Sequence, residues 1–329
     1  DADYNVDDII PAVRNGLSSD GALYAAPFYA ESSFLMYRPD LLEEAGQTMP
    51  EAPTWDEVAE IARAVDSDDV AGICLRGKPG WGDLGAAFTT VLNTFGGTYW
   101  AANDDGSIGE SQVDQPEFKE ALDFYVGLVQ DAGQDDASNA SFNECLNLYQ
   151  EGSTAMWYDA TVAASILEAD DSPVKGMNDF ALAPVQETDA SGWLWAWALA
   201  VPQNSPNPEA GWEYVSWATS QQYLESAAAE LGWAAVPPGT RQFLYDNAEY
   251  QEAAGAFADK TLDAMLAAPI DNPGTTPRPG LPGVQYVGVP EFQDFGTRCT
   301  EEIAAAIAGS QSTDDAQANC HAIAQEYTS

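Results

Sequence analysis

The chain has 329 residues with 53 acidic and 11 basic side chains, so its formal net charge is −42. This excess of carboxylates excludes binding to nucleic acid or to an anionic membrane through basic patches, because both need clustered Lys and Arg. Hydrophobic residues make up 45 % and aromatic residues 11 %, which excludes a disordered acidic chain and predicts a globular protein of two domains or lobes. The acidic residues are dispersed, a pattern typical either of adaptation to high salt or of an ordinary acidic secreted protein.

Short β-rich runs alternate with longer helical patterns along the chain. We expect strands over 22–26, 33–37, 70–75, 154–158, 180–183 and 196–201. Thr54, with Glu57 three residues further on, forms a capping box that predicts the start of a helix. Pro116 and Gly133 are expected to bound a second helix, and a third is expected over 207–224. This alternation predicts an α/β protein.

The segment 269–288 is rich in Pro and Gly and is the one long irregular stretch of the sequence. A loop of this length in a compact domain is more often functional or linking than structureless. In the functional interpretation Gln285 and Tyr286 line a cleft. The other interpretation, that the segment only covers a domain edge, stays equally open.

The C-terminal part of the sequence predicts a helical hairpin. One helix is expected over 299–308 and another over 316–327. Gly309 is expected to end the first helix as its C-terminal glycine, and Thr313 to cap the second.

This hairpin brings two of the four cysteines to the same level. Ten residues separate Cys299 from Gly309 and eleven separate Gly309 from Cys320. We therefore predict a disulfide between Cys299 and Cys320, and with it an oxidising compartment. Two buried free thiols are the alternative, and Cys74 with Cys145 is a second candidate pair.

Common signatures of catalysis and of cofactor binding are missing from the sequence. It has no Cys-x-x-Cys pair and a single histidine, His321, so a zinc site lacks its ligands or spacing. His321 is the only candidate base for a nucleophilic triad, and its place in the expected C-terminal helical hairpin favours a surface helix residue over a catalyst. The nucleophile elbow, the Walker A loop and the dinucleotide-binding glycine fingerprint are also absent. We expect no catalytic residue, no metal and no cofactor, while a carboxylate pair at glycosidase spacing stays open among so many acidic residues.

Aromatic residues gather at positions where a ligand could bind. Trp81 lies in the polar loop after the expected strand 70–75, and Trp157 and Asp159 lie where another strand ends. Ligands of open α/β sheets bind at such strand ends. Aromatic faces stack on the C–H faces of sugars, while Arg and Asp side chains hydrogen-bond to hydroxyls. The combination predicts a site for a polyhydroxylated ligand, with core packing as the alternative for each Trp singly.

Four segments resemble the extracellular solute-binding proteins of ABC transporters, in the group that takes up sugars. They are 24–46 (YAAPFYAESSFLMYRPDLLEEAG) with 53–62 (PTWDEVAEIA) behind it, 72–83 (GICLRGKPGWGD), 146–165 (LNLYQEGSTAMWYDATVAAS) and 195–220 (WAWALAVPQNSPNPEAGWEYVSWATS). The second and third are most similar to binding proteins for polyols such as sorbitol and mannitol. The resemblance implies a non-catalytic receptor that closes by hinge motion over one polyol or monosaccharide and delivers it to a membrane permease.

The implied fold class is α/β, a two-lobed periplasmic-binding-protein fold, type II-like, with crossover hinge strands. The first lobe is expected to comprise 1–38 and 200–262, and the second 39–199 and 263–329. Carried over position by position, the resemblance implies ligand contacts at Tyr29, Glu31, Arg76, Trp81, Asp83, Trp157, Tyr158, Asp159, Trp195, Trp233 and Gln285. Arg76 is expected to donate to adjacent hydroxyls, Asp83 and Asp159 to accept from them, and Trp81 or Trp157 to stack on the ligand.

The resemblance also implies where the protein works. Members of this family begin further upstream, so we expect the opening part of the first lobe to be missing here, together with a lipid anchor that precedes it. The expected location is extracellular or periplasmic, and the expected state is a monomer. No stretch of the sequence reaches the roughly 20 consecutive apolar residues that a membrane-spanning helix needs.

Two functions from other classes stay open at this point. One is a secreted carbohydrate-active enzyme with an acid/base carboxylate pair in an aromatic cleft. The other is an acidic surface adhesin without a small ligand. Turnover distinguishes the first from a receptor, because a receptor holds a polyol unchanged whereas an enzyme releases a product.

Overall fold

The structure, a computed structural model, describes residues 4–328 and divides into two compact units. Unit 1 comprises the described residues up to Ser32 together with Ala160–Lys175 and Leu194–Leu266. Unit 2 comprises Ser33–Asp159, Gly176–Trp193 and the described residues from Ala267 onward. Each unit is built from three separate stretches of chain, so residues far apart in the sequence share one core.

The sheet of unit 2 has a buried strand at its centre. Strand β4 (Ser33–Tyr37) lies between β7 (Met156–Ala160) and β8 (Asp179–Leu182), and it pairs with β8 in antiparallel register. Four of its five residues are buried, namely Ser33 and the apolar run 34–36, as expected of a central strand. All five residues of β7 are buried as well, so the carboxyl end of β7 carries side chains that are held in place on every side.

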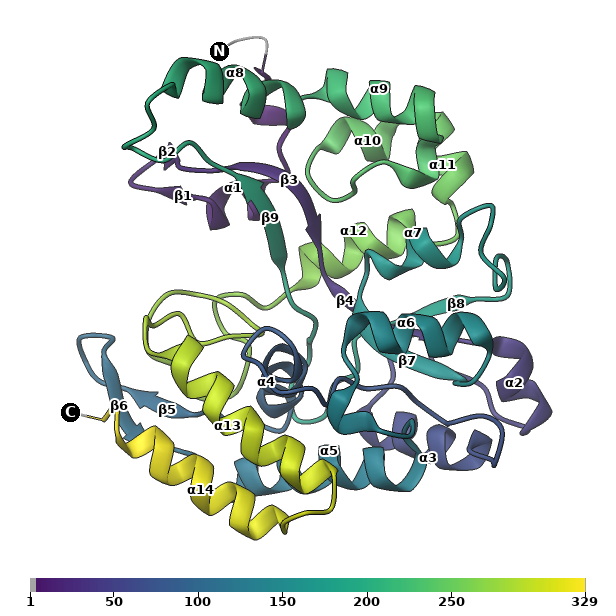
Figure 1. Ribbon diagram of the computed structural model, residues 1–329, viewed down its shortest axis with the longest axis vertical. Helices are drawn as coiled ribbons and strands as arrows, with labels where there is room; N and C mark the ends of the chain where they lie inside the picture. The colour runs from purple at the N-terminus through teal and green to yellow at the C-terminus, as the bar shows by residue number, and fades with distance from the viewer. Residues whose placement is uncertain (1–3, 329) are drawn as a thin grey trace. The chain divides into compact units, whose positions relative to one another are not determined.

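Helices cover this sheet and extend the core of unit 2 (Figure 1). They are α2 (Pro39–Glu44), α3 (Trp55–Val65), α4 (Leu84–Thr94), α5 (Pro116–Ala132), η3 (Ala137–Asn139), α6 (Phe142–Glu151), α13 (Phe292–Ile307) and α14 (Thr313–Gln325), with a hairpin of β5 (Trp100–Ala102) and β6 (Ile108–Ser111). Helices α4, α5, α13 and α14 pack on one another. The capping box of Thr54 and Glu57 is confirmed, and so are Pro116 and Gly133 as the bounds of α5.

The C-terminal hairpin forms with two differences from the prediction. Helix α13 begins seven residues before the expected start at 299, because Phe292 and Phe295 extend its buried face. Gly309 follows α13 in the left-handed conformation (φ 69°), as expected of a C-terminal glycine. Ser312, not Thr313, caps α14, since the Ser312 hydroxyl accepts the Asp315 backbone N–H at 3.1 Å. Cys299 and Cys320 are joined by a disulfide.

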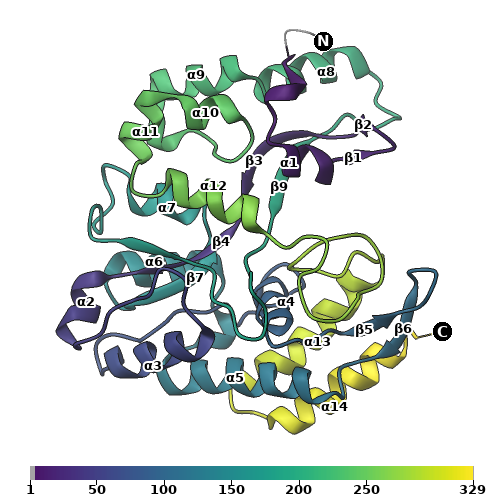
Figure 2. The same cartoon turned by 180° about the vertical axis from the view of Figure 1, so that it is seen from behind.

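Unit 1 contains a two-stranded antiparallel ribbon of β3 (Ala26–Glu31) and β9 (Trp195–Leu199), and a short pair of β1 (Ser18–Ser19) and β2 (Ala22–Leu23). Its helices are η2 (Val6–Asp8), α1 (Pro11–Gly16), α7 (Ala163–Leu167), α8 (Pro208–Ala218), α9 (Gln221–Leu231), η4 (Trp233–Ala235), α10 (Gln242–Asp246), α11 (Ala248–Ala254) and α12 (Ala258–Ala267). Helices α9, α10 and α11 lie together in both views (Figures 1 and 2).

Unit 1 departs from the predicted elements at two places. The expected strand 22–26 is divided, because β2 ends at Leu23 and β3 begins only at Ala26. Asp20 and Gly21, which both have positive φ, form the turn from β1 into β2 just before it. The expected helix 207–224 ends at Ala218, and the Ser220 hydroxyl accepts the Tyr223 N–H at 3.1 Å to begin α9.

The expected strand 70–75 is extended but makes only isolated bridges. Ala71 and Cys74 form parallel bridges with Thr154 and Trp157, while Ile73 forms one with Gly133. The segment therefore lies between the β7 region on one side and the end of α5 on the other. Within residues 4–328, no helix is both long and apolar enough to cross a bilayer.

Candidate functional site

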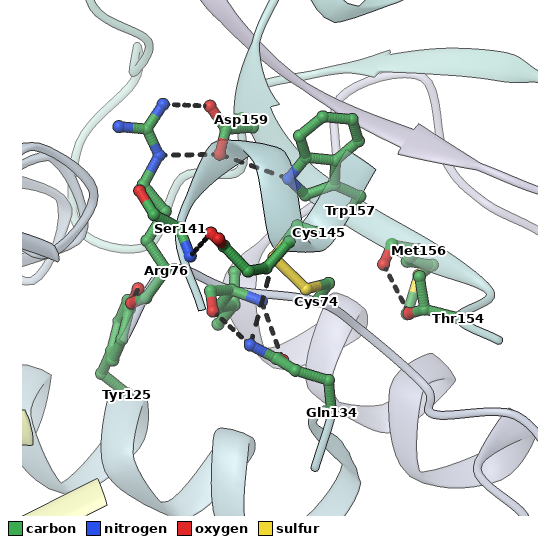
Figure 3. The surroundings of a disulfide bond; sticks show 12 residues. Cys74, Arg76, Tyr125, Gln134, Ser141, Cys145, Thr154, Met156, Trp157 and Asp159 are labelled. Atoms are coloured by element: carbon green, nitrogen blue, oxygen red, sulfur yellow. Dashed lines mark hydrogen bonds and ion pairs between the residues drawn. A yellow bond between two sulfur atoms is a disulfide. The ribbon is translucent and has the colours of Figure 1, made fainter. Parts of the chain in front are cut away.

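An ion pair between Arg76 and Asp159 is the centre of the candidate site in unit 2. Arg76 follows the extended segment 70–75, and Asp159 lies near the end of β7, so the parallel bridges bring them together. The Arg76 Nε donates to Asp159 Oδ2 at 2.8 Å, and Nη2 donates to Oδ1, which makes a two-point fork (Figure 3). The Asp159 side chain is 0 % exposed and that of Arg76 is 11 % exposed, so the pair is almost closed to solvent.

Further hydrogen bonds fix this pair. The Trp157 indole Nε1 donates to Asp159 Oδ2 at 3.2 Å, and Arg76 Nη1 donates to the Gly82 carbonyl at 3.0 Å. On the backbone, the Tyr125 hydroxyl donates to the Arg76 carbonyl at 2.6 Å. A buried ion pair is tolerated only when its geometry is good and its remaining polar atoms are hydrogen-bonded. The guanidinium is therefore held in one orientation before any ligand binds.

Aromatic rings surround the guanidinium. Its central carbon lies 5.9 Å from the ring centroid of Phe142 and 5.8 Å from that of Trp193. Trp193 in turn lies 6.0 Å from Tyr158, whose hydroxyl is hydrogen-bonded to the Ser33 hydroxyl at 2.9 Å. Burial raises the pKa of Tyr158 well above its ordinary value, so the phenol stays neutral. The arrangement offers a hydrogen-bonding cation set among apolar ring faces, which suits the mixed polar and C–H surface of a polyol.

The loop after Arg76 places Trp81 and Asp83 beside the pair. Both side chains are half-buried, in contrast to Trp157 and Asp159, which are fully buried. The Asp83 carboxylate accepts a hydrogen bond from the Ser141 hydroxyl, and the Gly80 backbone N–H donates to the Thr300 hydroxyl at 2.9 Å. The loop is thus anchored at both ends.

Gln285 belongs to the long irregular segment, which packs tightly against α4. The Asn93 Nδ2 donates to the Val284 carbonyl at 2.8 Å, and the Arg278 guanidinium donates to Asn93 Oδ1 at 3.0 Å. Desolvation lowers the pKa of Arg278 to about 10. Gln285 itself is 4 % exposed. A ligand contact at Gln285 stays a prediction.

Unit 1 carries a second group of expected site residues on one face of its ribbon. Tyr29 pairs with Trp197 and Glu31 pairs with Trp195, so these four side chains point to the same side of the two strands. Trp197 is 52 % exposed. Desolvation, with a smaller contribution from the Glu31 charge, raises the pKa of Tyr29 to about 12. The face presents stacked rings next to a buried carboxylate.

Trp197 was not among the residues expected to contact a ligand. Its signal was present in the sequence, because the alternate residues Trp195 and Trp197 share one side of an extended strand. Trp233, by contrast, lies on η4, and its indole Nε1 donates to Glu249 Oε2 of α11 at 2.8 Å. A ligand contact at Trp233 also stays a prediction.

The structure therefore groups the expected residues by unit. Unit 2 brings together Arg76, Trp157, Tyr158 and Asp159, with Trp81 and Asp83 on the adjoining loop, and unit 1 brings together Tyr29, Glu31 and Trp195. In the part of the chain that the structure describes, no group of three or more His, Cys, Asp and Glu side chains is arranged to hold a metal ion.

Known proteins resemble this chain over nearly its full length. The model of the bacterial extracellular solute-binding protein family matches residues 1–225. A mannitol-binding protein of Pseudomonas aeruginosa is 42 % identical over 321 residues, which cover 96 % of this chain and 72 % of that protein. An erythritol/L-threitol-binding protein of Mycolicibacterium smegmatis is 22 % identical, and the match covers all of this chain and 67 % of that protein.

Solved structures show the same fold. The solute-binding protein of an ABC transporter from Agrobacterium vitis, solved with bound D-mannitol, is 46 % identical, with a TM-score of 0.94 over 99 % of this chain and 78 % of that one. A maltose-bound protein of T. maritima, 23 % identical, has a TM-score of 0.79 over 98 % of this chain and 77 % of its own, which supports the fold alone.

Proposed function

Because the chain belongs to the bacterial extracellular solute-binding proteins, we propose that it is the binding component of an ABC importer whose ligand is an acyclic polyol of the mannitol type. The observation that carries the proposal is the Arg76–Asp159 fork, fixed among aromatic rings, in a chain 46 % identical to a protein solved with D-mannitol. Binding without turnover is part of the proposal.

In unit 2, each side chain has a role that follows from its exposure. Asp159 is fully buried and orients the guanidinium of Arg76, which donates to vicinal hydroxyls of the polyol. Asp83 is half-buried and accepts from a hydroxyl, and the half-buried Trp81 supplies a stacking face. The roles assigned to Asp159 and Asp83 differ for this reason, although both are carboxylates near the same cation.

In unit 1, the ribbon face supplies the apolar contacts. Trp197 and Tyr29 offer ring faces to C–H groups, and Glu31 accepts from a hydroxyl. We propose that units 1 and 2 are the two lobes of the receptor. The proposal also includes a monomeric state, delivery to permease subunits, a lipid anchor, and tolerance of high salt.

A thermal-shift panel followed by recovery of the ligand tests this function. A ligand that binds only the folded state raises the melting temperature with concentration. We expect a rise with D-mannitol or D-sorbitol, and none with maltose at the same concentration. Mass spectrometry of the recovered polyol should show it unchanged. No shift with any polyol, or a new product from one, would contradict the proposal.

A further inference from the structure

The disulfide between Cys74 and Cys145 joins two elements that both reach Arg76 (Figure 3). Cys74 lies two residues before Arg76, and its backbone N–H donates to the Met156 carbonyl of β7 at 2.8 Å. Cys145 lies on α6, one turn after Phe142. The two Cα atoms are 5.6 Å apart and both cysteines are 0 % exposed. The covalent bond therefore lies inside the core directly beneath the site.

The first turn of α6 contacts the site at two places. The Phe142 ring lies 5.9 Å from the Arg76 guanidinium carbon, and the Ser141 hydroxyl donates to the Asp83 carboxylate. Any shift of α6 relative to the segment that carries Arg76 therefore moves both the ring beside the guanidinium and the partner of Asp83. The disulfide limits that shift, since Cys145 is on the same helix.

Hydrogen bonds hold the same segment from the side of α5. Gln134 accepts the Leu75 backbone N–H at 3.2 Å and donates to the Leu75 carbonyl at 2.6 Å, while Tyr125 donates to the Arg76 carbonyl. These bonds fix the segment on the side of α5. On the side of α6, the Gly77 and Lys78 backbone N–H groups both donate to the Ala140 carbonyl at 2.9 Å, just before the helix begins. A hydrogen bond exchanges with water when the structure opens, whereas a disulfide does not. The disulfide is thus the one covalent link from α6 to the segment.

We propose that the Cys74–Cys145 disulfide is a positioning element of the ligand site, which keeps α6 in register with Arg76 and so preorganises the guanidinium, Phe142 and Asp83 for the polyol. This inference rests on the proposed function. Preorganisation raises affinity because the bound geometry no longer has to be selected from many at the moment of binding. The second disulfide, between Cys299 and Cys320, joins α13 to α14 and provides a comparison within the same unit.

Two double variants make the test. C74A with C145V removes the disulfide beside the site while keeping the buried volume filled, and C299A with C320V does the same between α13 and α14. With D-mannitol as the probe, calorimetry should give a Kd about tenfold or more above wild type for the first and within about twofold for the second. Unchanged affinity in the first variant, or an equal loss in both, overturns the proposal.

A cycle with Arg76→Lys separates positioning from general loosening. Lysine keeps the charge but cannot form the two-point fork. Since the guanidinium fork is one of the groups that the disulfide positions, removing the disulfide in the R76K background should cost clearly less affinity than in wild type. Equal losses in the two backgrounds contradict a positioning role.

A replacement variant and the wild-type measurement keep the test decisive. If circular dichroism shows that C74A with C145V does not fold, Phe142→Leu with both disulfides intact takes its place, and unchanged D-mannitol affinity in that variant overturns the proposal. Wild type is measured first. If the folded wild type binds no polyol, both the proposed function and this inference are contradicted. If the wild type binds a polyol and the variants bind it equally well, only the inference is contradicted.

Discussion

Tyr29 and Trp197 stand opposite each other on β3 and β9, with ring centroids 6.0 Å apart and ring planes only 26° from parallel. The pair is set by strand register, and Trp195 adds an edge contact to Trp197 at 6.2 Å. An indole that is half exposed next to a stacked phenol is poised for the C–H face of a ligand, since its other face is already supported.

Replacing Trp197 by Ala is expected to weaken polyol binding about tenfold, because the exposed stacking face is lost. Tyr214→Ala is the matched control, since Tyr214 is also an aromatic residue of unit 1 and is 62 % exposed on α8. Calorimetry of both variants with D-mannitol checks the prediction. Equal affinities of W197A and wild type would show that the ribbon face does not contact the polyol.

Asp159→Asn should lower the free energy of unfolding by about 3 kcal/mol, because it leaves the Arg76 charge buried without its counter-charge. The control is Asp131→Asn, whose ion pair with Arg63 is about half exposed on both sides and should change stability by less than about 1 kcal/mol. Chemical denaturation at constant high salt measures both. If the free energies of unfolding of the two variants differed by only about 0.3 kcal/mol, the buried pair would contribute no more to stability than the exposed pair.

The Tyr29 phenol should titrate near pH 12, above its ordinary value of 10. The folded state favours the protonated phenol, so its contribution to stability is complete below about pH 10 and is lost as the pH rises through about 12. Glu31→Gln removes a like charge and should move the titration part of the way back. An ultraviolet pH titration of wild type and E31Q, each against its Y29F counterpart, isolates the signal. If Tyr29 titrates at its ordinary pKa in both wild type and E31Q, the prediction of a raised pKa is wrong.

Salt should stabilise this protein strongly. With a net charge of −42, the compact state carries self-repulsion that ions screen as the Debye length shortens. We expect the melting temperature to rise steadily from dilute buffer to molar KCl. A neutral osmolyte at equal osmolality should raise it less, because an uncharged solute does not screen the repulsion between carboxylates. A melting temperature independent of KCl favours an ordinary acidic secreted protein over adaptation to high salt.

Local sequence signals predicted most elements but not the contacts that make the site. The strand 33–37 and the capping box at Thr54 follow from patterns within a few residues, and both are confirmed. The fork between Arg76 and Asp159 joins residues 83 positions apart, and its geometry depends on two parallel bridges that no local pattern encodes. Both residues could be named as candidates, but not as partners.

Burial is the second property that the sequence did not disclose. The resemblance implies ligand contacts at Trp157, Tyr158 and Asp159, and these stay predictions; all three residues are fully buried. Phe142 of α6 packs on Trp157, while Trp55 of α3 and Trp193 pack on Tyr158, so their burial is a tertiary effect. Trp197 shows the reverse, because a residue passed over as one of several tryptophans is half exposed beside Tyr29.

Isothermal titration of the folded wild-type chain with D-mannitol, in dilute buffer and at high salt, tests the central claim most directly. We predict saturable binding of one polyol per chain, with micromolar or tighter affinity, and clearly weaker binding of maltose. Heats indistinguishable from dilution for D-mannitol, D-sorbitol and D-arabitol, from a chain shown to be folded by circular dichroism, would contradict the account of this protein as a polyol receptor.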